Sequence, residues 1–293
     1  MEKIVSLSSV VAALVIGAVI YYLRSRRRVN PIRGGVALIT GGGSGIGLEI
    51  AKQLAQRHCH VLLVGRTEVA LKEGCRQCIN AGATSAIYVV ADVTSEVDCR
   101  AISTWVKESF AVLHYLVLNA GQGAITPFDS SDESLDICRK MMEINYFANV
   151  RLIQLCLPWL EVGKGHIVVV SSLAGVLPSC LRAAYTASKH AIQGFSHALR
   201  QELQQTRITV CCPGFVDTQF HDKVLSVGLP HSTPKRKGMT AGECASLCLQ
   251  GVERNELEVV MTTMGWLGYH LRPFFPKLVD LIAKRKALTS IGK

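Results

Sequence analysis

The sequence predicts a doubly wound α/β fold, with a parallel sheet and helices on both of its faces. Three observations predict it. Short apolar runs recur along the chain, and each has the length of a buried strand. Amphipathic segments separate these runs, as in proteins with a parallel sheet. Glycine or polar residues follow the runs, at the edge where open α/β sheets bind ligands.

Length and charge narrow the class of protein. The chain has 293 residues, of which 49% are hydrophobic, enough for one large core. Its net charge is +10, but eleven of its 32 basic residues lie in three peripheral clusters, which leaves 21 against 22 acidic residues. The body is therefore almost neutral, which argues against a nucleic-acid groove, while basic clusters beside apolar segments favour lipid headgroups. The clusters are Arg24, Arg26, Arg27, Arg28 and Arg33; Lys235, Arg236 and Lys237; and Lys284, Arg285 and Lys286.

The N-terminal segment predicts a single-pass membrane anchor. Ile4 to Leu23 are twenty consecutive positions without a charge, enough to cross a bilayer as a transmembrane helix. The alternative is a cleaved signal peptide, whose apolar region is shorter and ends in a small-residue cleavage site. Here the span runs into RSRRR, whereas Lys3 on its other side is offset by Glu2. The positive-inside bias therefore places the body in the cytosol.

The cysteines do not form a pattern typical of a secreted protein. There are eleven, spread from Cys59 to Cys248, and the chain has no Asn-x-Ser/Thr sequon. Cys75 and Cys78 form a CxxC pair with no partner pair or nearby histidine. Packing on a helix face is the favoured interpretation of this pair over a zinc site, and no metal is predicted.

The first expected strand, Val36–Thr40, passes directly into GGGSGIG and then into an amphipathic helix, Ile46–Gln56. Strand, glycine turn and helix start in this order are the setting of a dinucleotide-binding fingerprint. The glycines let the backbone approach a pyrophosphate, and the helix N-terminus supplies partial positive charge. A Rossmann-type domain is therefore predicted, with cofactor contacts from Gly41, Ser44, Gly45, Ile46 and Gly47.

The second expected strand, His60–Val64, indicates which cofactor binds. It ends in Gly65-Arg66, nineteen residues after Gly47, where NAD-binding domains carry an acidic residue for the ribose 2′-hydroxyl. A guanidinium suits a 2′-phosphate in charge and geometry, so NADP(H) is predicted. The alternative is a solvated surface arginine in a protein that accepts NAD.

The third expected strand, Ala86–Val90, leads to Asp92 and Val93 at the same edge. The Asp92 carboxylate is a candidate partner of the adenine amino group. A cap for the helix that begins near Ser95 is the competing interpretation.

The fourth expected strand, Tyr115–Leu118, is followed by Asn119-Ala120-Gly121. The glycine permits close approach of a cofactor, and the asparagine either ties neighbouring strands together or serves the site. A long helical region follows with Asn145 among apolar residues, whose amide requires a partner in the core backbone or an ordered water beside Lys189.

The residues that most clearly predict chemistry follow the next strand, Ile167–Val170. Ser172 lies just beyond the end of this strand. If a helix begins near Ala183, Tyr185 and Lys189 stand four residues apart on one face. A neighbouring cation lowers a tyrosine pKa, which suits proton exchange with a carbonyl or alcohol oxygen, and Ser172 adds a hydrogen-bond donor for that oxygen. An ordinary solvated helix face is the alternative for the pair alone.

These motifs together resemble the short-chain dehydrogenase/reductase family, from about Val36 to Val260. The resemblance implies that Tyr185 is the general acid/base and that Ser172 positions the carbonyl. It implies that Lys189 binds the nicotinamide ribose and lowers the tyrosine pKa, and that Asn145 holds a proton-relay water. It further implies cofactor contacts from Asp92, Val93, Asn119, Ala120, Gly121, Tyr185, Lys189, Pro213, Gly214, Val216 and Thr218.

One position departs from the family pattern. NADP-preferring members often have a basic residue just before the second glycine of the motif, and this chain has Ser44 there. The prediction of NADP(H) therefore depends on Arg66.

The anchor and the AAYTASKHAIQGF helix are similar to membrane-bound hydroxysteroid dehydrogenases and related microsomal reductases. This similarity implies an enzyme of the endoplasmic reticulum membrane. Its substrate is then a steroid, retinoid or other lipophilic molecule with a carbonyl or secondary alcohol, and a homodimer is its expected assembly. Two alternatives stay open. One is a 3-keto-sphingoid or fatty-acyl ketoreductase, and the other is a catalytically idle scaffold or lipid-binding member of the fold.

The region after Pro213 is expected to be irregular from Thr218 to Met239. It is a candidate substrate lid, with a disordered linker as the alternative. Thr240 to Glu243 resembles a capping box that starts a helix, and Glu258 to Met261 is the expected closing strand.

The C-terminal tail is apolar and basic. Gly265 to Ala283 is rich in aromatic and aliphatic residues but is interrupted by Pro273 and Pro276, which argue against a second span. An amphipathic segment on the membrane surface or beside the substrate entrance is expected. The predicted organisation is an anchor and basic segment (1–29), an NADP-binding catalytic domain (30–264) and this tail (265–293).

Overall fold

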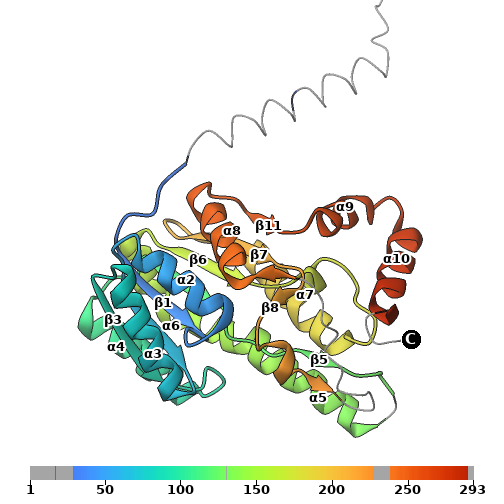
Figure 1. Cartoon of the computed structure of the whole chain (residues 1–293), viewed down its shortest axis with the longest axis horizontal. Coiled ribbons are helices and arrows are strands. Elements are labelled where there is room, and N and C mark those ends of the chain that lie inside the picture. Colours follow the sequence, from blue (N-terminus) through green and yellow to red (C-terminus); the bar gives the residue numbers. More distant parts are fainter. Residues whose placement is uncertain (1–16, 18–28, 130, 227–237, 290–293) are drawn as a thin grey trace, which may run out of the picture.

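The computed structural model describes residue 17 and residues 29–129, 131–226 and 238–289. A seven-stranded sheet lies at the centre, in the order β11-β7-β6-β4-β1-β2-β3, with helices on both faces (Figure 1). Every pairing within this sheet is parallel. The predicted Rossmann-type doubly wound α/β fold is confirmed for the body of the chain.

The central strands are short because each is a buried apolar run. Adjacent residues face opposite layers: Leu38 belongs to one core cluster and Ile39 to the other, and neither has any exposed surface. The predicted bounds agree with the observed ones to within one residue, and β7 alone lacked predicted bounds. The strands are β1 Val36–Thr40, β2 His60–Gly65, β3 Ser85–Val90, β4 Tyr115–Leu118, β6 His166–Val170, β7 Arg207–Cys212 and β11 Glu258–Val260.

Six helices form the two layers that cover the sheet. One layer contains α2 (Gly45–Ala55), α3 (Glu68–Ala81) and α8 (Ala241–Glu253). The other contains α4 (Glu96–Ser109), α6 (Ala148–Gly163) and α7 (Ala183–Leu199). Because the sheet is covered on both faces, its ligands must approach at the ends of the strands.

Cys75 and Cys78 pack from α3 into the first of these layers, as the packing interpretation expects. Burial raises the pKa of Cys75 to about 11 and that of Cys78 to about 12. Such burial opposes the thiolate form that binds a metal. Among the described residues, no group of three histidine, cysteine or acidic side chains is placed to hold a metal ion.

A continuous helical stretch precedes β6, as predicted. It consists of α5 (Asp132–Met142), a π-helical turn η1 (Glu143–Phe147) and α6. The N-cap of α5 is Ser131, whose side chain accepts a hydrogen bond from the Ser134 N–H. The π turn carries Asn145, and such turns are frequent at functional sites.

The predicted irregular region from Thr218 to Met239 contains short elements where the structure describes it. The strand β8 (Val216–Asp217) pairs with β10 (Met239–Thr240), and β9 (Leu225–Ser226) pairs with β5 (Ala124–Ile125). The 3₁₀ turns are η2 (Leu173–Gly175) and η3 (His221–Lys223). Residues 227–237 lie outside the described residues, so the lid prediction is untested there. The capping box of Thr240 and Glu243 at the start of α8 is confirmed.

The predicted membrane anchor, Ile4 to Leu23, also lies outside the described residues apart from Gly17. Within residues 29–129, 131–226 and 238–289, every helix is too short or too polar to span a bilayer.

The C-terminal tail forms two helices, α9 (Thr263–Leu271) and α10 (Pro276–Thr289). They lie beside the main helical layers rather than within them (Figure 1). Pro276 is the first residue of α10, where a missing N–H costs no hydrogen bond. The tail is therefore interrupted at the prolines, as expected, and its first helix begins two residues before the predicted boundary at Gly265.

Candidate active site

A cavity of about 1140 Å³ runs along the carboxyl edge of the sheet. Every predicted site residue except Gly47 and Asn145 lines it, although these residues come from segments far apart in the sequence. Those that line it are Gly41, Ser44, Gly45, Ile46, Arg66, Asp92, Val93, Asn119, Ala120, Gly121, Ser172, Tyr185, Lys189, Pro213, Gly214, Val216 and Thr218.

The glycine turn between β1 and α2 forms one end of the cavity. Gly41 has φ +64° and Gly45 has φ +56°, conformations that L side chains rarely adopt. Ser44 is the N-cap of α2, and its side chain makes no capping hydrogen bond. The first turn of the helix therefore faces the cavity with its partial positive charge available to an anion.

Gly47 has a structural role instead of a place in the cavity wall. A Cβ atom there would lie 2.5 Å from both the Gly41 carbonyl oxygen and the Asn119 Nδ2 atom. The residue is thus required for the helix to pack against the turn. The prediction that Gly47 contacts the cofactor directly stays a prediction.

Asn119 ties two strands together, the first of the two roles considered for it. Its Nδ2 atom donates to the backbone oxygens of Thr40 at 3.0 Å and Gly41 at 3.3 Å. The Thr40 hydroxyl in turn accepts from the backbone N–H groups of Asn119 and Ala120, both at 3.0 Å. These bonds hold the glycine turn against the segment that follows β4.

Arg66 follows β2 and Asp92 follows β3, and their side chains face each other in the same cavity. Arg66 Nη1 lies 3.7 Å from Asp92 Oδ2, and the arginine side chain is 71% exposed. An exposed ion pair of this length contributes little stability, so it leaves the guanidinium available to a ligand. The Arg66 side chain lies at the end of β2, as the sequence predicts for a residue that selects the cofactor.

The capping interpretation of Asp92 is wrong, because Ser95 caps α4 by accepting from the Asp98 N–H. Asp92 Oδ1 instead accepts from the backbone N–H and hydroxyl of Thr94, at 2.9 and 2.8 Å. Burial opposes ionisation, but these hydrogen bonds and Arg66 together lower the pKa of Asp92. It is therefore a carboxylate at neutral pH.

Tyr185, Lys189 and Ser172 line the same cavity. The helix α7 begins at Ala183, as predicted, and places Tyr185 and Lys189 on one buried face, with 5% and 4% of their surfaces exposed. Lys189 Nζ lies 5.9 Å from the centroid of the Tyr185 ring and donates to the Val170 carbonyl oxygen at 3.0 Å. This burial excludes the alternative of a solvated helix face.

The predicted lowering of the Tyr185 pKa is not the net effect in this structure, and the contribution of Lys189 to it stays a prediction. Burial raises the pKa of Tyr185, while a hydrogen bond with Ser172 and the charge of Arg182 oppose that rise. Burial also lowers the pKa of Lys189 to about 8, so the ammonium is itself weakened as a cation. The charge of Arg182, three residues before Tyr185, also lowers the pKa of that phenol.

The two serines after β6 have different surroundings. Ser171 accepts a hydrogen bond from Gln193 Nε2 at 2.8 Å, which ties it to α7. Ser172 is the N-cap of the 3₁₀ turn Leu173–Gly175, and its Oγ accepts from the Ala174 N–H at 3.1 Å. A hydroxyl that accepts this bond still has one hydrogen to donate, either to Tyr185 or to a ligand.

Asn145 is fully buried beside the cavity, and its partners are protein atoms. Its Oδ1 accepts from the Gln122 N–H at 3.0 Å, and its Nδ2 donates to the Gln122 oxygen at 2.9 Å and to Ser188 Oγ at 3.0 Å. The Asn145 side chain thus positions the turn after Gly121. A Cβ atom at position 121 would lie 2.7 Å from Asn145 Oδ1. The proton-relay role stays a prediction.

The other end of the cavity is mostly apolar and contains residues that the sequence analysis did not assign to the site. The tail helices supply part of it, as one of the two interpretations of the tail expects. In the sequence, Arg182 and His221 differ from other polar residues only in that each lies three positions from a predicted site residue, Tyr185 and Thr218 respectively. This end is lined by Leu177, Pro178, Arg182, Phe215, Phe220, His221, Leu267, Leu271, Val279, Ile282 and Lys286.

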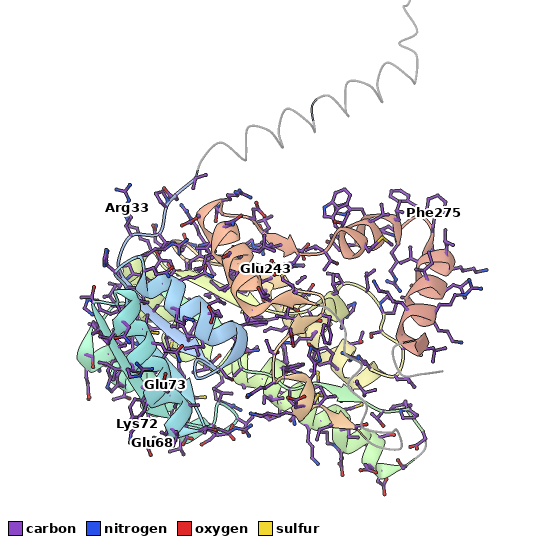
Figure 2. All side chains as sticks on the ribbon, in the orientation of Figure 1. Arg33, Glu68, Lys72, Glu73, Glu243 and Phe275 are labelled. Carbon is purple, nitrogen blue, oxygen red and sulfur yellow. The ribbon has the colours of Figure 1, made fainter. Side chains whose placement is uncertain are left out.

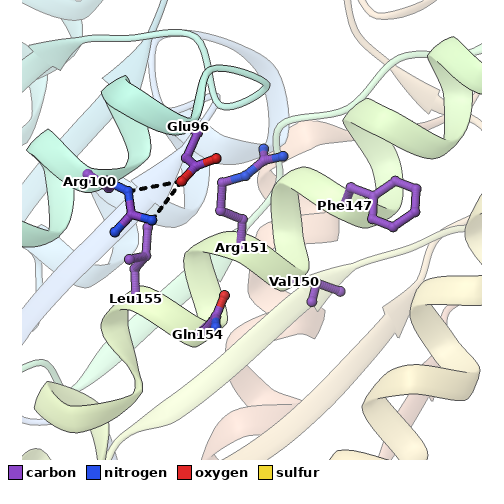
Figure 3. Close-up of a pocket in the computed structure, with 7 residues that line it drawn as sticks. All are labelled: Glu96, Arg100, Phe147, Val150, Arg151, Gln154 and Leu155. Atoms are coloured by element: carbon purple, nitrogen blue, oxygen red, sulfur yellow. Dashed lines mark hydrogen bonds and ion pairs between the residues drawn. The ribbon is translucent and has the colours of Figure 1, made fainter.

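A second, smaller pocket of about 240 Å³ lies between α4 and α6 (Figure 3). Its charged groups satisfy one another: Arg100 donates to Glu96 Oε1, with its Nη2 atom at 2.6 Å. Arg151 donates to Glu143 at 3.1 Å and to the Thr94 carbonyl oxygen at 3.3 Å. This pocket therefore offers no unsatisfied charge for a ligand.

Comparisons with known proteins agree with this geometry. A profile of the short chain dehydrogenase family matches residues 35–226. "Dehydrogenase/reductase SDR family protein 7-like" of Dictyostelium discoideum is 34% identical over 263 residues, covering 88% of this chain and 83% of that protein. "Hydroxysteroid 11-beta-dehydrogenase 1-like protein" of Xenopus tropicalis is 32% identical over 238 residues, covering 78% of this chain and 82% of that protein.

Solved structures share the fold. A short chain dehydrogenase/reductase from Burkholderia phymatum in complex with NAD superposes with a TM-score of 0.72 at 24% identity, covering 84% of this chain and 95% of that one. A short chain dehydrogenase from Burkholderia cenocepacia in complex with NADP gives 0.73 at 21% identity, covering 86% and 98%.

Proposed function

Because the chain belongs to the short chain dehydrogenase family of oxidoreductases, which act on CH–OH and C=O groups, we propose that it transfers hydride between NADP(H) and a lipophilic carbonyl or secondary alcohol. One observation carries the proposal. Tyr185, Lys189 and Ser172 meet in a single cavity that has a glycine cradle at one end and an apolar wall at the other.

The residues of the cradle fit a dinucleotide. The open first turn of α2 suits a pyrophosphate, and the loops at Asp92 and Gly121 bring backbone close to the same cavity. When bound, the nicotinamide supplies or accepts the hydride. Lys189 lines the same cavity, where its ammonium can donate to the ribose next to that ring.

Ser172 and Tyr185 perform the proton chemistry in this proposal. The Ser172 hydroxyl donates to the substrate oxygen, and Tyr185 donates its phenolic proton to that oxygen during reduction or removes it during oxidation. The burial of both Tyr185 and Lys189 keeps water away from these groups, which strengthens their electrostatic interactions. The charge of Arg182 favours the phenolate that forms after proton donation.

The preference for NADP(H) is supported by Arg66. The acidic residue typical of NAD enzymes is absent at the end of β2, and the guanidinium there lies 3.7 Å from Asp92 Oδ2 in an exposed pair that a 2′-phosphate can compete for.

The lipophilic substrate is supported by the apolar end of the cavity and by relatives named hydroxysteroid dehydrogenase-like. A steroid, a retinoid and a 3-keto-sphingoid or fatty-acyl compound all fit this chemistry. We further propose that Ile4 to Leu23 anchors the enzyme in the endoplasmic reticulum membrane with its body in the cytosol. Protease added to intact microsomes should then digest the body without detergent, and protection would contradict this topology. The homodimer implied by the resemblance stays a prediction.

The direct test is an NADPH-oxidation screen of the detergent-solubilised full chain against ketosteroids, retinal and 3-keto lipids. We expect turnover with at least one of these classes. Nucleotide binding without turnover of any of them would favour the catalytically idle alternative.

A further inference from the structure

The tail helices α9 and α10 bear an unusually apolar exterior. Together with the short connection between them, they carry nine of the twenty large hydrophobic side chains that are exposed among the described residues. We call these nine the C-terminal apolar surface. They are Met264, Trp266, Leu267, Leu271, Phe274, Phe275, Leu278, Leu281 and Ile282. Exposed apolar side chains concentrated in one segment in this way indicate an interaction site in a soluble domain.

This exposure is not a consequence of a poorly packed tail. Gly265 and Gly268 face the body, where a Cβ would lie 2.5 Å from Leu173 Cδ2 and 3.1 Å from Leu177 Cδ1 respectively. The Tyr269 hydroxyl donates to Glu258 Oε2 at 2.8 Å, which fixes α9 to the end of the sheet. The apolar surface is therefore held in place on the outside of a docked helix.

The segment that carries this surface is basic. Between Thr263 and Thr289 there is one acidic residue, Asp280, and its carboxylate accepts from Arg272 Nε at 2.9 Å. A second copy of the chain related by a two-fold axis would place like charges against one another. An anionic lipid surface, in contrast, is complementary in charge. The basic residues of this segment are Arg272, Lys277, Lys284, Arg285 and Lys286.

Position and continuity also favour a membrane. Figure 2 shows Phe275 and Arg33 along the same edge of the molecule, and the described chain before Arg33 leaves the body there. The segment that precedes it in the sequence is the predicted anchor. Leu267, Leu271 and Ile282 are exposed on the surface and also line the cavity. The apolar exterior is thus continuous with the substrate end of the cavity.

We propose that α9 and α10 form a second membrane contact, which inserts the C-terminal apolar surface into an anionic phospholipid leaflet and opens the substrate end of the cavity to lipid. Aromatic side chains beside lysine and arginine are typical of such interfacial helices. The functional part of this proposal rests on the lipophilic substrate proposed above, whereas the membrane contact itself does not.

Trp266 reports the contact directly. The full chain is reconstituted into vesicles of phosphatidylserine and brominated phosphatidylcholine, whose bromine atoms quench nearby indoles. The chain carries Trp105→Phe and Trp159→Phe, so that Trp266 is its sole tryptophan. We expect strong quenching of Trp266 fluorescence. Should the double variant fail to fold, the quenching lost on Trp266→Phe in the otherwise natural chain gives the same information.

Two results would overturn the proposal. One is an unquenched Trp266 in protein that still sediments with the vesicles, since the anchor alone would then hold it. The other is an emission that changes with protein concentration but not with lipid, which would show that a second copy covers the surface. Quenching that is equal on vesicles without phosphatidylserine would overturn the anionic part.

Phe274 and Phe275 test the functional part, because they belong to the surface but lie outside the cavity wall. For the double serine variant, we expect KM for a bilayer-dissolved ketosteroid or retinoid to rise at least roughly tenfold, with kcat unchanged. KM for a small water-soluble ketone should not change. Val97→Ser, which removes a 76% exposed side chain from α4, is the matched control. Equal KM values for the Phe variant and the control would overturn lipid-side entry. Fluorescence quenching needs no turnover, so a failure of the proposed reaction remains distinguishable.

Discussion

Lys189 Nζ lies 5.9 Å from the centroid of the Tyr185 ring, one helical turn away on the buried face of α7. Its hydrogen bond at 3.0 Å goes to the Val170 carbonyl oxygen, at the end of the strand that leads to Ser172. The ammonium thus ties the strand to the helix, and Lys189 also lines the cavity. This arrangement allows the binding role proposed for Lys189 to be tested separately from the proton transfer proposed for Tyr185.

Lys189→Met should weaken binding of NADPH and lower the rate. The pKa of Lys189 is lowered to about 8, so the ammonium form persists below that pH and is lost as pH rises through it. Wild-type affinity should therefore fall between pH 7 and 9, whereas the variant should be weak and insensitive across this range. Loss of a charged hydrogen bond predicts a Kd about 10- to 100-fold higher at pH 7. Fluorescence titration of NADPH measures it, and a Met variant with wild-type affinity would exclude the binding role.

Arg66→Asp should reverse the cofactor preference. The change removes a partner for the 2′-phosphate and adds a repelling charge beside Asp92. We expect the ratio of NADPH to NADH affinity to fall by about 100-fold or more. Arg100→Asp, on an exposed part of α4 outside the cavity, is the control and should leave the ratio unchanged. An unaltered ratio in the Arg66 variant would remove the basis for NADP(H).

Two glycine substitutions test whether the turn after β1 is sterically required. Gly47→Ala places a Cβ 2.5 Å from the Gly41 carbonyl oxygen, so it should destabilise the fold by about 1–3 kcal/mol and weaken nucleotide binding. Gly194→Ala in α7 meets no atom within 4 Å and should stabilise the fold by about 0.5–1 kcal/mol. Urea unfolding measures both. Similar effects of the two changes would contradict the packing described for Gly47.

His166 should make the fold sensitive to acid. It is buried in β6, where desolvation and nearby arginines lower its pKa to about 3. Its Nε2 lies 2.8 Å from Thr209 Oγ1, and this hydroxyl donates its own hydrogen to the Glu256 carbonyl oxygen. The hydrogen between Nε2 and Oγ1 must therefore belong to Nε2 of a neutral ring. The unfolded chain binds a proton near pH 6.5 and the folded chain does not. Stability contributed by the neutral ring is therefore full above pH 6.5 and is lost as pH falls toward 3.

This contribution amounts to at most about 1.4 kcal/mol per pH unit. His166→Gln should flatten the decline of unfolding free energy between pH 6 and 4, which urea unfolding at several pH values measures. An equally steep decline in the variant would assign the acid sensitivity to other groups.

The strands and the cradle could be predicted because their signals are local. A strand buried on both faces is an apolar run, and a turn with positive φ at Gly41 and Gly45 needs glycine. The spacing of Tyr185 and Lys189 likewise follows from the helical period.

Other features could not be predicted because their partners are distant in the sequence. Asn145 bonds to Gln122 and Ser188, which are 23 and 43 residues away, and no local pattern selects them. The pKa of Tyr185 depends on how deeply the fold buries it, and the sequence shows the cation at Lys189 without showing that burial. The tail helices reach the cavity only because α9 docks on Leu173 and Leu177.

Tyr185→Phe tests the central proposal most directly, since it removes one oxygen and keeps the ring that contacts Phe220. Thermal unfolding and NADPH affinity should remain close to the wild type, while the single-turnover rate of hydride transfer to a responsive substrate falls about 10²- to 10⁴-fold. A variant that folds, binds NADPH and still reduces that substrate at nearly the wild-type rate would show that Tyr185 is not the proton donor.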